Sequence, residues 1–236
     1  MRAQIFSDIH LKLIPLAFRP PKVVAPQLIL AGDITTRYDP ELLNKYFSII
    51  SPLYQKIYYV PGNHEYFDRG GRGRSPCNEY FSRTYDPPYI TKELEKVCQN
   101  YPNIEFLYNR TLIEDNVAIF GTPFPTNHLR REHELAKEAL ASFLTLPYRK
   151  CIIITHYAPL LTDVYHEKWK HGPSLPRFCF DGLSLIHPRP ARDITWIFGH
   201  THYACDFMRN GIRFVSNPVY NENRGLPFDE TKIVEA

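Results

Sequence analysis

Short apolar runs recur along the chain, separated by polar, proline-rich or helix-like stretches. They are continuous rather than alternating, which predicts buried strands. The six runs are Ala3–Phe6, Leu28–Ala31, Ile57–Val60, Val117–Phe120, Cys151–Thr155 and Ile194–Phe198. Ile212–Ser216 alternates instead, and it follows the turn sequence "RNG". This pattern predicts a C-terminal hairpin with Ala204–Met208 as the partner strand.

Three stretches between these runs place apolar residues at helical spacing. Pro40–Tyr54 is predicted as a helix with Asp39 as its N-cap and Pro40 at its first position. Thr91–Gln99 is predicted to start at a threonine cap, and Arg131–Leu144 forms a third helix. The apolar face of the third helix is predicted to hold Leu135, Ala139, Leu140 and Phe143. Strands that alternate with helices predict a layered α/β fold.

The length of 236 residues suits one domain, so we interpret residues 1–236 as a single domain. Two segments, at about 66–89 and 157–190, lack a strand or helix pattern and are predicted to be long loops. Strand patterns resume after each loop, which argues against an interdomain linker. The basic stretch Arg69–Arg74 in the first loop could bind polyphosphate or nucleic acid, but a mobile surface loop is favoured.

Composition narrows the classes of protein that fit. Hydrophobic residues make up 44% and charged residues 22%, as in ordinary globular proteins. A net charge of +3 is too small to indicate a nucleic-acid or membrane partner. The five cysteines form no CxxC pair, which disfavours a disulfide framework and a thiolate zinc site. With no signal-peptide pattern and no apolar run of about 20 residues, we expect a soluble cytoplasmic protein.

Polar side chains follow five of the predicted strands at their carboxyl ends. The sequences are "SDIH", "AGD", "PGNHE", "HYAP" and "GHTH". They supply Asp8, His10, Asp33, Asn63, His64, His156, His200 and His202. Because ligand sites of open α/β sheets form at this edge, we expect these side chains to lie close together.

The residue types indicate a metal centre. Oxygen and nitrogen donors without sulfur suit Mn, Fe, Zn, Ni or Co rather than copper(I), and the many imidazoles disfavour calcium. The aspartate after Gly32, Asp33, could bridge two ions about 3.5–4 Å apart, which would bind a phosphoryl oxygen and create a hydroxide nucleophile. Taken singly, Asp8 could be a helix cap and His156 a core histidine. The ordered series DxH, GD, GNH, H, GHxH favours the metal centre.

This ordered series resembles the calcineurin-like metallophosphoesterase superfamily, in its single-domain phosphoesterase branch. The resemblance runs from Arg2 to the C-terminus, and the segment "DFMRNGIRFVSNPVY" also fits, with its hairpin, "SNP" turn and a final short strand beyond. It implies a four-layer αββα sandwich, in which two facing mixed β-sheets are flanked by helices. It also implies a centre of two divalent metal ions between the sheet edges.

The resemblance also implies roles for individual residues. Asp8, His10 and His202 would hold the first metal, Asp33 would bridge, and Asn63, His156 and His200 would hold the second. His64 would protonate the leaving oxygen. Arg37 and Asn63 are candidate substrate contacts, although an exposed loop position fits Arg37 equally well. Glu65 is either an orienting residue behind the ligands or a plain surface carboxylate.

The chain departs from the protein phosphatases of this superfamily. Their "GDxxDRG" pattern reads "GDITTRYD" here, so Thr36 replaces the aspartate that would pair with the catalytic histidine, and Tyr38 replaces a glycine. Leu11 replaces the glycine of "GDxHG". These differences disfavour a phosphoprotein substrate.

Further histidines lie outside the series. His133 has charged neighbours in the third helix and is expected to be exposed. His166 and His171 lie in the second long loop, where they could line a substrate pocket or simply lie at the surface.

We therefore predict a two-metal phosphohydrolase that acts by a metal-activated hydroxide, with a phosphodiesterase on small nucleotide-type phosphate esters favoured. Three alternatives remain: a phosphomonoesterase or protein phosphatase, a nuclease, and a catalytically idle protein-interaction scaffold. The sequence leaves the identity of the metals and the oligomeric state open.

Overall fold

The computed structural model describes residues 1–11, 13, 19–67, 87–126, 130–170, 175–186, 192–220 and 225–236. In these residues eleven strands form two sheets. The first sheet has the order β11 (Ile233–Glu235), β1 (Arg2–Phe6), β2 (Gln27–Ala31), β3 (Lys56–Val60) and β4 (Ile104–Phe106). The second has the order β5 (Arg110–Glu114), β6 (Val117–Thr122), β7 (Lys150–Thr155), β8 (Asp193–Phe198), β10 (Ile212–Ser216) and β9 (Cys205–Arg209).

Both sheets are mixed. In the first, β1 to β4 run parallel and β11 is antiparallel to β1. In the second, β6, β7, β8 and β10 run parallel, and β5 and β9 pair antiparallel at the two edges. Every strand predicted from an apolar run is present. The sequence did not indicate β4 and β5, because β4 has only three residues and β5 is only partly buried.

The two sheets face each other across a core of branched side chains. Ile5 and Ile29 of the first sheet pack with Ile119, Ile152 and Ile197 of the second. The alternate residues of each strand point outward, because successive side chains of a strand lie on opposite faces. These outward residues pack under helices, which gives the four-layer αββα sandwich that the resemblance implied.

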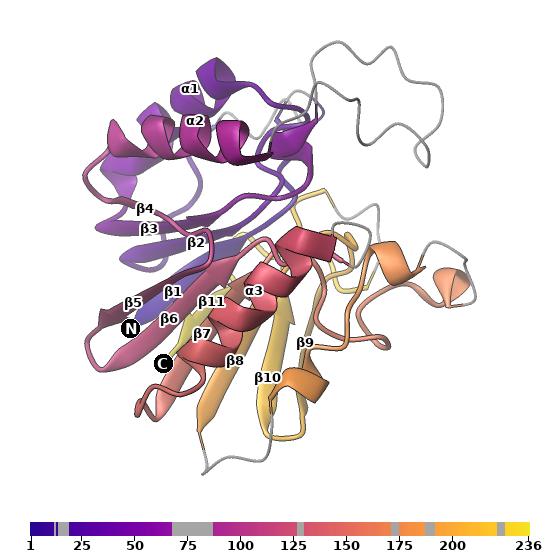
Figure 1. Cartoon of the computed structure of the whole chain (residues 1–236). Coiled ribbons are helices and arrows are strands. Elements are labelled where there is room, and N and C mark those ends of the chain that lie inside the picture. The colour runs from indigo at the N-terminus through magenta and orange to yellow at the C-terminus, as the bar shows by residue number, and fades with distance from the viewer. Residues whose placement is uncertain are drawn as a thin grey trace.

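Helices cover both outer faces (Figure 1). α1 (Pro40–Ile50) and α2 (Pro87–Gln99) pack on the first sheet, and α3 (Arg130–Phe143) packs on the second. Asp39 caps α1 as predicted, since its side chain accepts a hydrogen bond from Leu42 N at 3.1 Å. The helix ends at Ile50, and a 3₁₀ turn, Ser51–Leu53, follows it.

The other two helices differ from the predictions. α2 begins at Pro87 rather than at Thr91, because proline is tolerated in the first turn of a helix. In α3 the prediction for Leu135 was wrong, since this residue is 45% exposed. His133, expected to be exposed, is instead buried, and its Nδ1 lies 2.7 Å from the carbonyl oxygen of Pro125.

Parts of the two predicted loops lie outside the described residues. These parts are 68–86, with the basic stretch Arg69–Arg74, and 171–174 and 187–190, with His171. Residues 87–89 of the first loop belong to α2, and the described part of the second loop contains three short 3₁₀ helices. Cys98, Cys151, Cys179 and Cys205 are free and buried, while Cys77 falls outside the described part.

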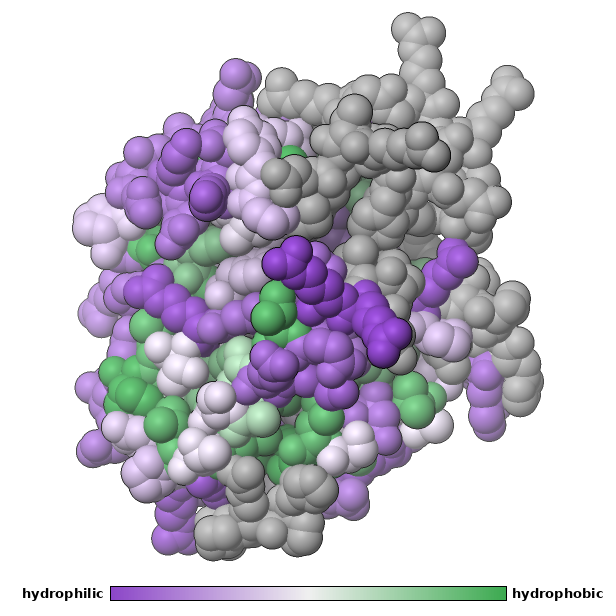
Figure 2. Space-filling view, viewed as in Figure 1, coloured by the Kyte–Doolittle hydropathy of each residue, from purple (hydrophilic) through white to green (hydrophobic). Residues whose placement is uncertain are grey.

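The surface has a mixed character. Figure 2 shows hydrophilic side chains over the α1 and α2 region and apolar side chains scattered lower on the same face. In the part of the chain that the structure describes, no helix combines the length and the apolar character needed to cross a membrane.

Candidate metal centre

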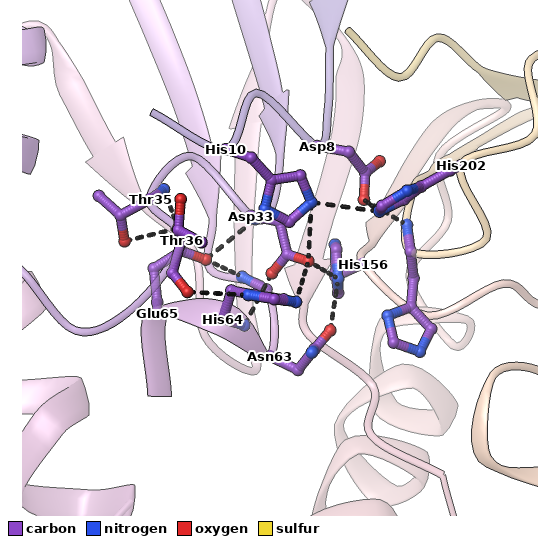
Figure 3. A network of polar contacts seen from close by, with 12 residues as sticks. Asp8, His10, Asp33, Thr35, Thr36, Asn63, His64, Glu65, His156 and His202 are labelled. Carbon is purple, nitrogen blue, oxygen red and sulfur yellow. Dashed lines mark hydrogen bonds and ion pairs between the residues drawn. The ribbon is translucent and has the colours of Figure 1, made fainter. Parts of the chain in front are cut away.

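The predicted polar residues meet at the carboxyl ends of β1, β2, β3, β7 and β8. Figure 3 shows Asp8, His10, Asp33, Asn63, His64, His156 and His202 gathered there. They form two groups whose candidate ligand atoms lie within 4.8 Å of one another. The first group contains Asp8, His10, Asp33 and His202, and the second contains Asp33, His156 and His200. Asp33 therefore belongs to both groups.

The backbone at these positions is unusual. Positive φ angles occur at Asp8 (50°), His10 (48°), Asp33 (54°), His200 (69°) and His202 (52°). Left-handed backbone costs a non-glycine residue roughly 1–2 kcal/mol, although Asp and His tolerate it better than most. These five residues indicate that the chain is bent sharply after β1, β2 and β8, where it presents their side chains. Strain of this kind concentrates at functional sites.

Two glycines allow the carboxylates to sit close to the backbone. A Cβ at Gly62 would lie 2.1 Å from Asp33 Oδ1, and a Cβ at Gly199 would lie 2.5 Å from Asp8 Oδ2. No larger residue fits at either position without moving a carboxylate. The glycines of "GNHE" and "GHTH" are thus required by the packing around the site.

The first group places imidazole nitrogens and carboxylate oxygens close together. Nε2 of His10 and Nε2 of His202 are 3.1 Å apart, and His202 Nε2 is 3.5 Å from Asp8 Oδ1. Asp8 Oδ2 is buried without a hydrogen bond. Burial raises the pKa of Asp8 to about 7 and lowers the pKa of His10 to about 4. A cation between the Asp8 carboxylate and the imidazoles would satisfy the buried Asp8 Oδ2.

The second group is arranged around His156. Its Nδ1–H donates to the carbonyl oxygen of Ala31 at 2.9 Å, which directs Nε2 toward Asn63 Oδ1 at 2.9 Å and Asp33 Oδ2 at 3.2 Å. Although burial opposes a charge on the ring, Asp33 raises the pKa of His156 to about 9. His200 Nε2 is buried without a partner. A proton on His156 balances the negative charge of Asp33 in this group. A divalent ion bound here would displace that proton.

The donor set therefore fits divalent metal ions. Nitrogen and oxygen atoms converge in both groups, and no thiol contributes to either. Burial alone would raise the pKa of Asp33, but the imidazoles of His156 and His64 hold it well below its usual range. The carboxylate is thus charged and available as a ligand. These features suit Mn, Fe, Zn, Ni or Co.

Glu65 ties two of the strand ends together from behind the ligands. It is buried and accepts hydrogen bonds from Asp33 N at 2.9 Å, Thr35 N at 2.8 Å and Gly62 N at 2.6 Å. Burial, together with the charge of Asp33, raises the pKa of Glu65 to about 7. Its burial excludes the surface alternative that the sequence left open. The carboxylate fixes the loops after β2 and β3 relative to each other.

His64 lies at the edge of the centre with its ring orientation fixed. Its Nδ1–H donates to the carbonyl oxygen of Thr36 at 2.9 Å, and its Nε2 lies 4.0 Å from Asp33 Oδ2. Thr36 is held in turn by a bond from its Oγ1 to the carbonyl oxygen of Leu11 at 2.7 Å. The main-chain carbonyl of Thr36 therefore makes the contact to the histidine that an aspartate side chain makes in the "GDxxDRG" pattern. Arg37, the next residue, is exposed.

Sequence reasoning missed the aromatic residues beside the candidate ligands, among them Tyr220 and Phe178. The Tyr220 ring lies 5.7 Å from the His10 ring and 5.3 Å from the His202 ring, centroid to centroid. Its N–H donates to the carbonyl oxygen of Asp8 at 2.9 Å. Phe178 packs against His200 with centroids 4.9 Å apart. The "SNP" turn before Tyr220 was a signal for the first residue, but no motif marked the second.

The chain belongs to the calcineurin-like phosphoesterase family, whose model matches residues 1–204. Membership in this family implies a metal-dependent phosphohydrolase. An uncharacterized protein of Acanthamoeba polyphaga mimivirus is 30% identical, over 84% of this chain and 79% of that protein.

Solved structures confirm the fold. The phosphopantetheinyl hydrolase of Mycobacterium tuberculosis superposes with a TM-score of 0.57 at 14% identity, covering 93% of this chain and 90% of that one. A Staphylococcus aureus protein described as a 5′-nucleotidase superposes with a TM-score of 0.50 at 14% identity, covering 92% of this chain and 48% of that one.

Proposed function

We propose that this protein is a phosphoesterase that works with two divalent metal ions. The observation that carries the proposal is the position of Asp33, whose carboxylate belongs to two neighbouring groups of nitrogen and oxygen donors. Asp33 Oδ2 faces His10 Nε2 of the first group at 3.8 Å and His156 Nε2 of the second at 3.2 Å, so one aspartate can serve two ions at once. A single structural ion would not require the second group.

The ligands follow from the two groups. Asp8, His10 and His202 would hold one ion and Asn63, His156 and His200 the other, with Asp33 shared between them. Bound at these positions, the ions would supply the Lewis-acid charge that polarises a phosphoryl group and lowers the pKa of a water. The buried donors and the bent strand ends keep this constellation rigid before substrate arrives.

His64 is the proposed proton donor to the leaving oxygen. Its Nδ1–H is committed to the Thr36 carbonyl, so Nε2 is the atom that exchanges a proton with the substrate. The side chain is 26% exposed, whereas Asp33 beside it is buried. A positioned imidazole of this kind contributes about 10²- to 10⁴-fold to the rate.

We favour phosphodiesters of the nucleotide type as substrates. Thr36 and Tyr38 depart from the pattern of the protein phosphatases, which disfavours a phosphoprotein substrate. Arg37 is exposed on the loop that carries Thr36, so it is a candidate contact for a non-bridging phosphate oxygen, together with the Asn63 amide.

The test is hydrolysis of bis-p-nitrophenyl phosphate beside p-nitrophenyl phosphate, with Mn²⁺ added and with a chelator, alongside the metal content of the same batch. We expect two ions per chain, diester hydrolysis that the chelator abolishes, and no turnover by His200→Ala. Preference for the monoester would overturn the substrate assignment only. Full activity of a well-folded His200→Ala variant would overturn the two-metal assignment.

A further inference from the structure

Phe178 is an apolar residue left at the surface beside the metal centre. It is 40% exposed, whereas other phenylalanines, such as Phe120, Phe124 and Phe214, are fully buried in the cores. Its ring packs nearly parallel to that of the candidate ligand His200, with centroids 4.9 Å apart and an interplanar angle of 29°. The buried Tyr157 ring also contacts His200, at 4.2 Å.

The backbone around Phe178 is fixed, so its exposure follows from the fold. Its carbonyl oxygen accepts a hydrogen bond from Ala158 N at 3.3 Å, in a bridge that also pairs Ala158 with Cys179. Phe180, two residues on, stacks on Phe124 with centroids 4.0 Å apart. Pairing of residues 178 and 179 with Ala158 and stacking of Phe180 hold the 178–180 segment in place while the Phe178 ring remains accessible.

We infer that Phe178 is a stacking platform for the base of a nucleotide-type substrate. The inference rests on the proposed function, which places the phosphate at the ions held in part by His200. In a nucleotide, the sugar separates the base from the phosphate. Phe178 contacts the candidate ligand His200, so the His200 side chain separates it from the proposed position of the phosphate. Stacking on an aromatic face tolerates different bases, because every base presents a flat π surface.

The competing role for Phe178 is purely structural: the ring could serve only to cover His200 and keep it in position. A structural role predicts that loss of the ring impairs every substrate to the same degree. A platform predicts a loss that depends on whether the substrate carries a base. The two roles are therefore separated by a ratio of two substrates and not by activity alone.

The experiment compares thymidine 5′-(p-nitrophenyl phosphate) with the same ester of 1,2-dideoxyribose, which has the sugar and leaving group but no base. For each variant, kcat/KM of the thymidine ester is divided by kcat/KM of the base-free ester. We expect Phe178→Ala to lower this ratio between about fivefold and about a hundredfold. Phe178→Tyr, which keeps the ring, should retain it. Ile113→Ala, at a residue 44% exposed on β5, is the matched surface control.

Binding supplies a second readout that does not depend on turnover. Calorimetry with Mn²⁺ present measures the affinities for thymidine 5′-phosphate and for inorganic phosphate. The Phe178→Ala substitution should weaken the binding of the nucleotide and leave the binding of phosphate unchanged. An equal loss of kcat/KM for both esters, or of affinity for both ligands, would overturn the proposed stacking role of Phe178 and leave the structural role. If wild type cleaves neither ester, the proposed hydrolysis fails, and the affinity ratio still decides the role of Phe178.

Discussion

Two aspartates of this protein, Asp206 and Asp33, differ in the groups that surround their carboxylates. Asp206 on β9 receives hydrogen bonds from Arg213 Nε at 2.9 Å and Nη2 at 2.8 Å, and it also contacts Lys232. Permanent cations of the chain match its charge. Asp33 is buried among three imidazoles with Nε2 atoms 3.2 to 4.0 Å from its Oδ2. In the described residues it has no ion pair with lysine or arginine.

The difference lies in what balances the negative charge. Arginine and lysine remain charged near neutral pH, so the Asp206 cluster is complete as it stands. Two of the imidazoles around Asp33, those of His10 and His156, are candidate metal ligands, and Asp8 Oδ2 and His200 Nε2 are buried without partners nearby. A buried cluster that its own side chains do not complete indicates a site for an added cation. The following substitutions test this contrast.

Asp33→Asn should have the largest effect. The amide keeps the shape but removes the charge that both groups share, so we expect metal content to fall from two ions to one or fewer and turnover to fall to background. The rise in melting temperature that Mn²⁺ gives wild type should also be lost, because ligand binding to the native state is what stabilises it. Elemental analysis, hydrolysis and thermal melting measure these three effects.

Asp206→Asn is the matched control for that experiment. It makes the same chemical change at a carboxylate whose charge the chain already balances, and it should leave metal content and turnover unchanged. If the two variants lost metal equally, the contrast between the two aspartates would be wrong.

His64→Asn should separate binding from chemistry. The histidine lies beside the ligands and its proposed role is proton transfer, so turnover should fall about 10²- to 10⁴-fold. Both ions should stay bound, since the six residues proposed to hold them with Asp33 are unchanged. Elemental analysis and kcat for the diester are the measurements. A variant that loses an ion together with its activity would show that His64 acts as a ligand.

The sequence predicted most of this centre because its residues obey a simple rule of position. Asp8, Asp33 and His156 each follow a continuous apolar strand, and parallel strands bring their carboxyl ends to one edge. The sequence did not predict β4 and β5, because β4 is short and β5 is only partly buried, so their hydrophobic patterns are weak.

Other features depended on three-dimensional packing that no local pattern encodes. Which face of α3 is buried depends on how the helix packs against its sheet. The helix buries His133, whereas hydrophobicity alone favoured Leu135 for the buried face. The contact between His64 and the Thr36 carbonyl could not be predicted either. A sequence motif identifies side chains, and here the main chain makes the contact. Phe178 also reaches the site through a loop without a motif.

Glu65→Gln should have an intermediate effect. The carboxylate accepts three backbone N–H bonds, and an amide would turn an NH₂ group toward at least one of these donors. We expect a 10- to 100-fold loss in metal affinity or activity, the usual cost of changing a residue that orients ligands. Metal titration of the chelator-stripped protein measures it. Wild-type affinity and activity in this variant would show that the clamp is dispensable.

Asp206→Asn should have the smallest effect, confined to stability. The bidentate bonds from Arg213, with the contact to Lys232, lower the pKa of Asp206, so its contribution is present above the unfolded pKa and lost as pH falls through the folded one. At pH 7 we expect a loss of about 1 kcal/mol in the free energy of unfolding, the upper end of the range for surface ion pairs, because this pair is bidentate and partly buried.

Urea unfolding of the metal-free protein between pH 7 and pH 3 measures this loss. The difference between wild type and Asp206→Asn should shrink below about pH 4, where an unfolded aspartate takes up its proton. A difference that stayed constant to pH 3 would mean that shape rather than charge holds the cluster. Asp206 would then no longer illustrate a carboxylate balanced by permanent cations, and the reading of Asp33 would rest on its metal content alone.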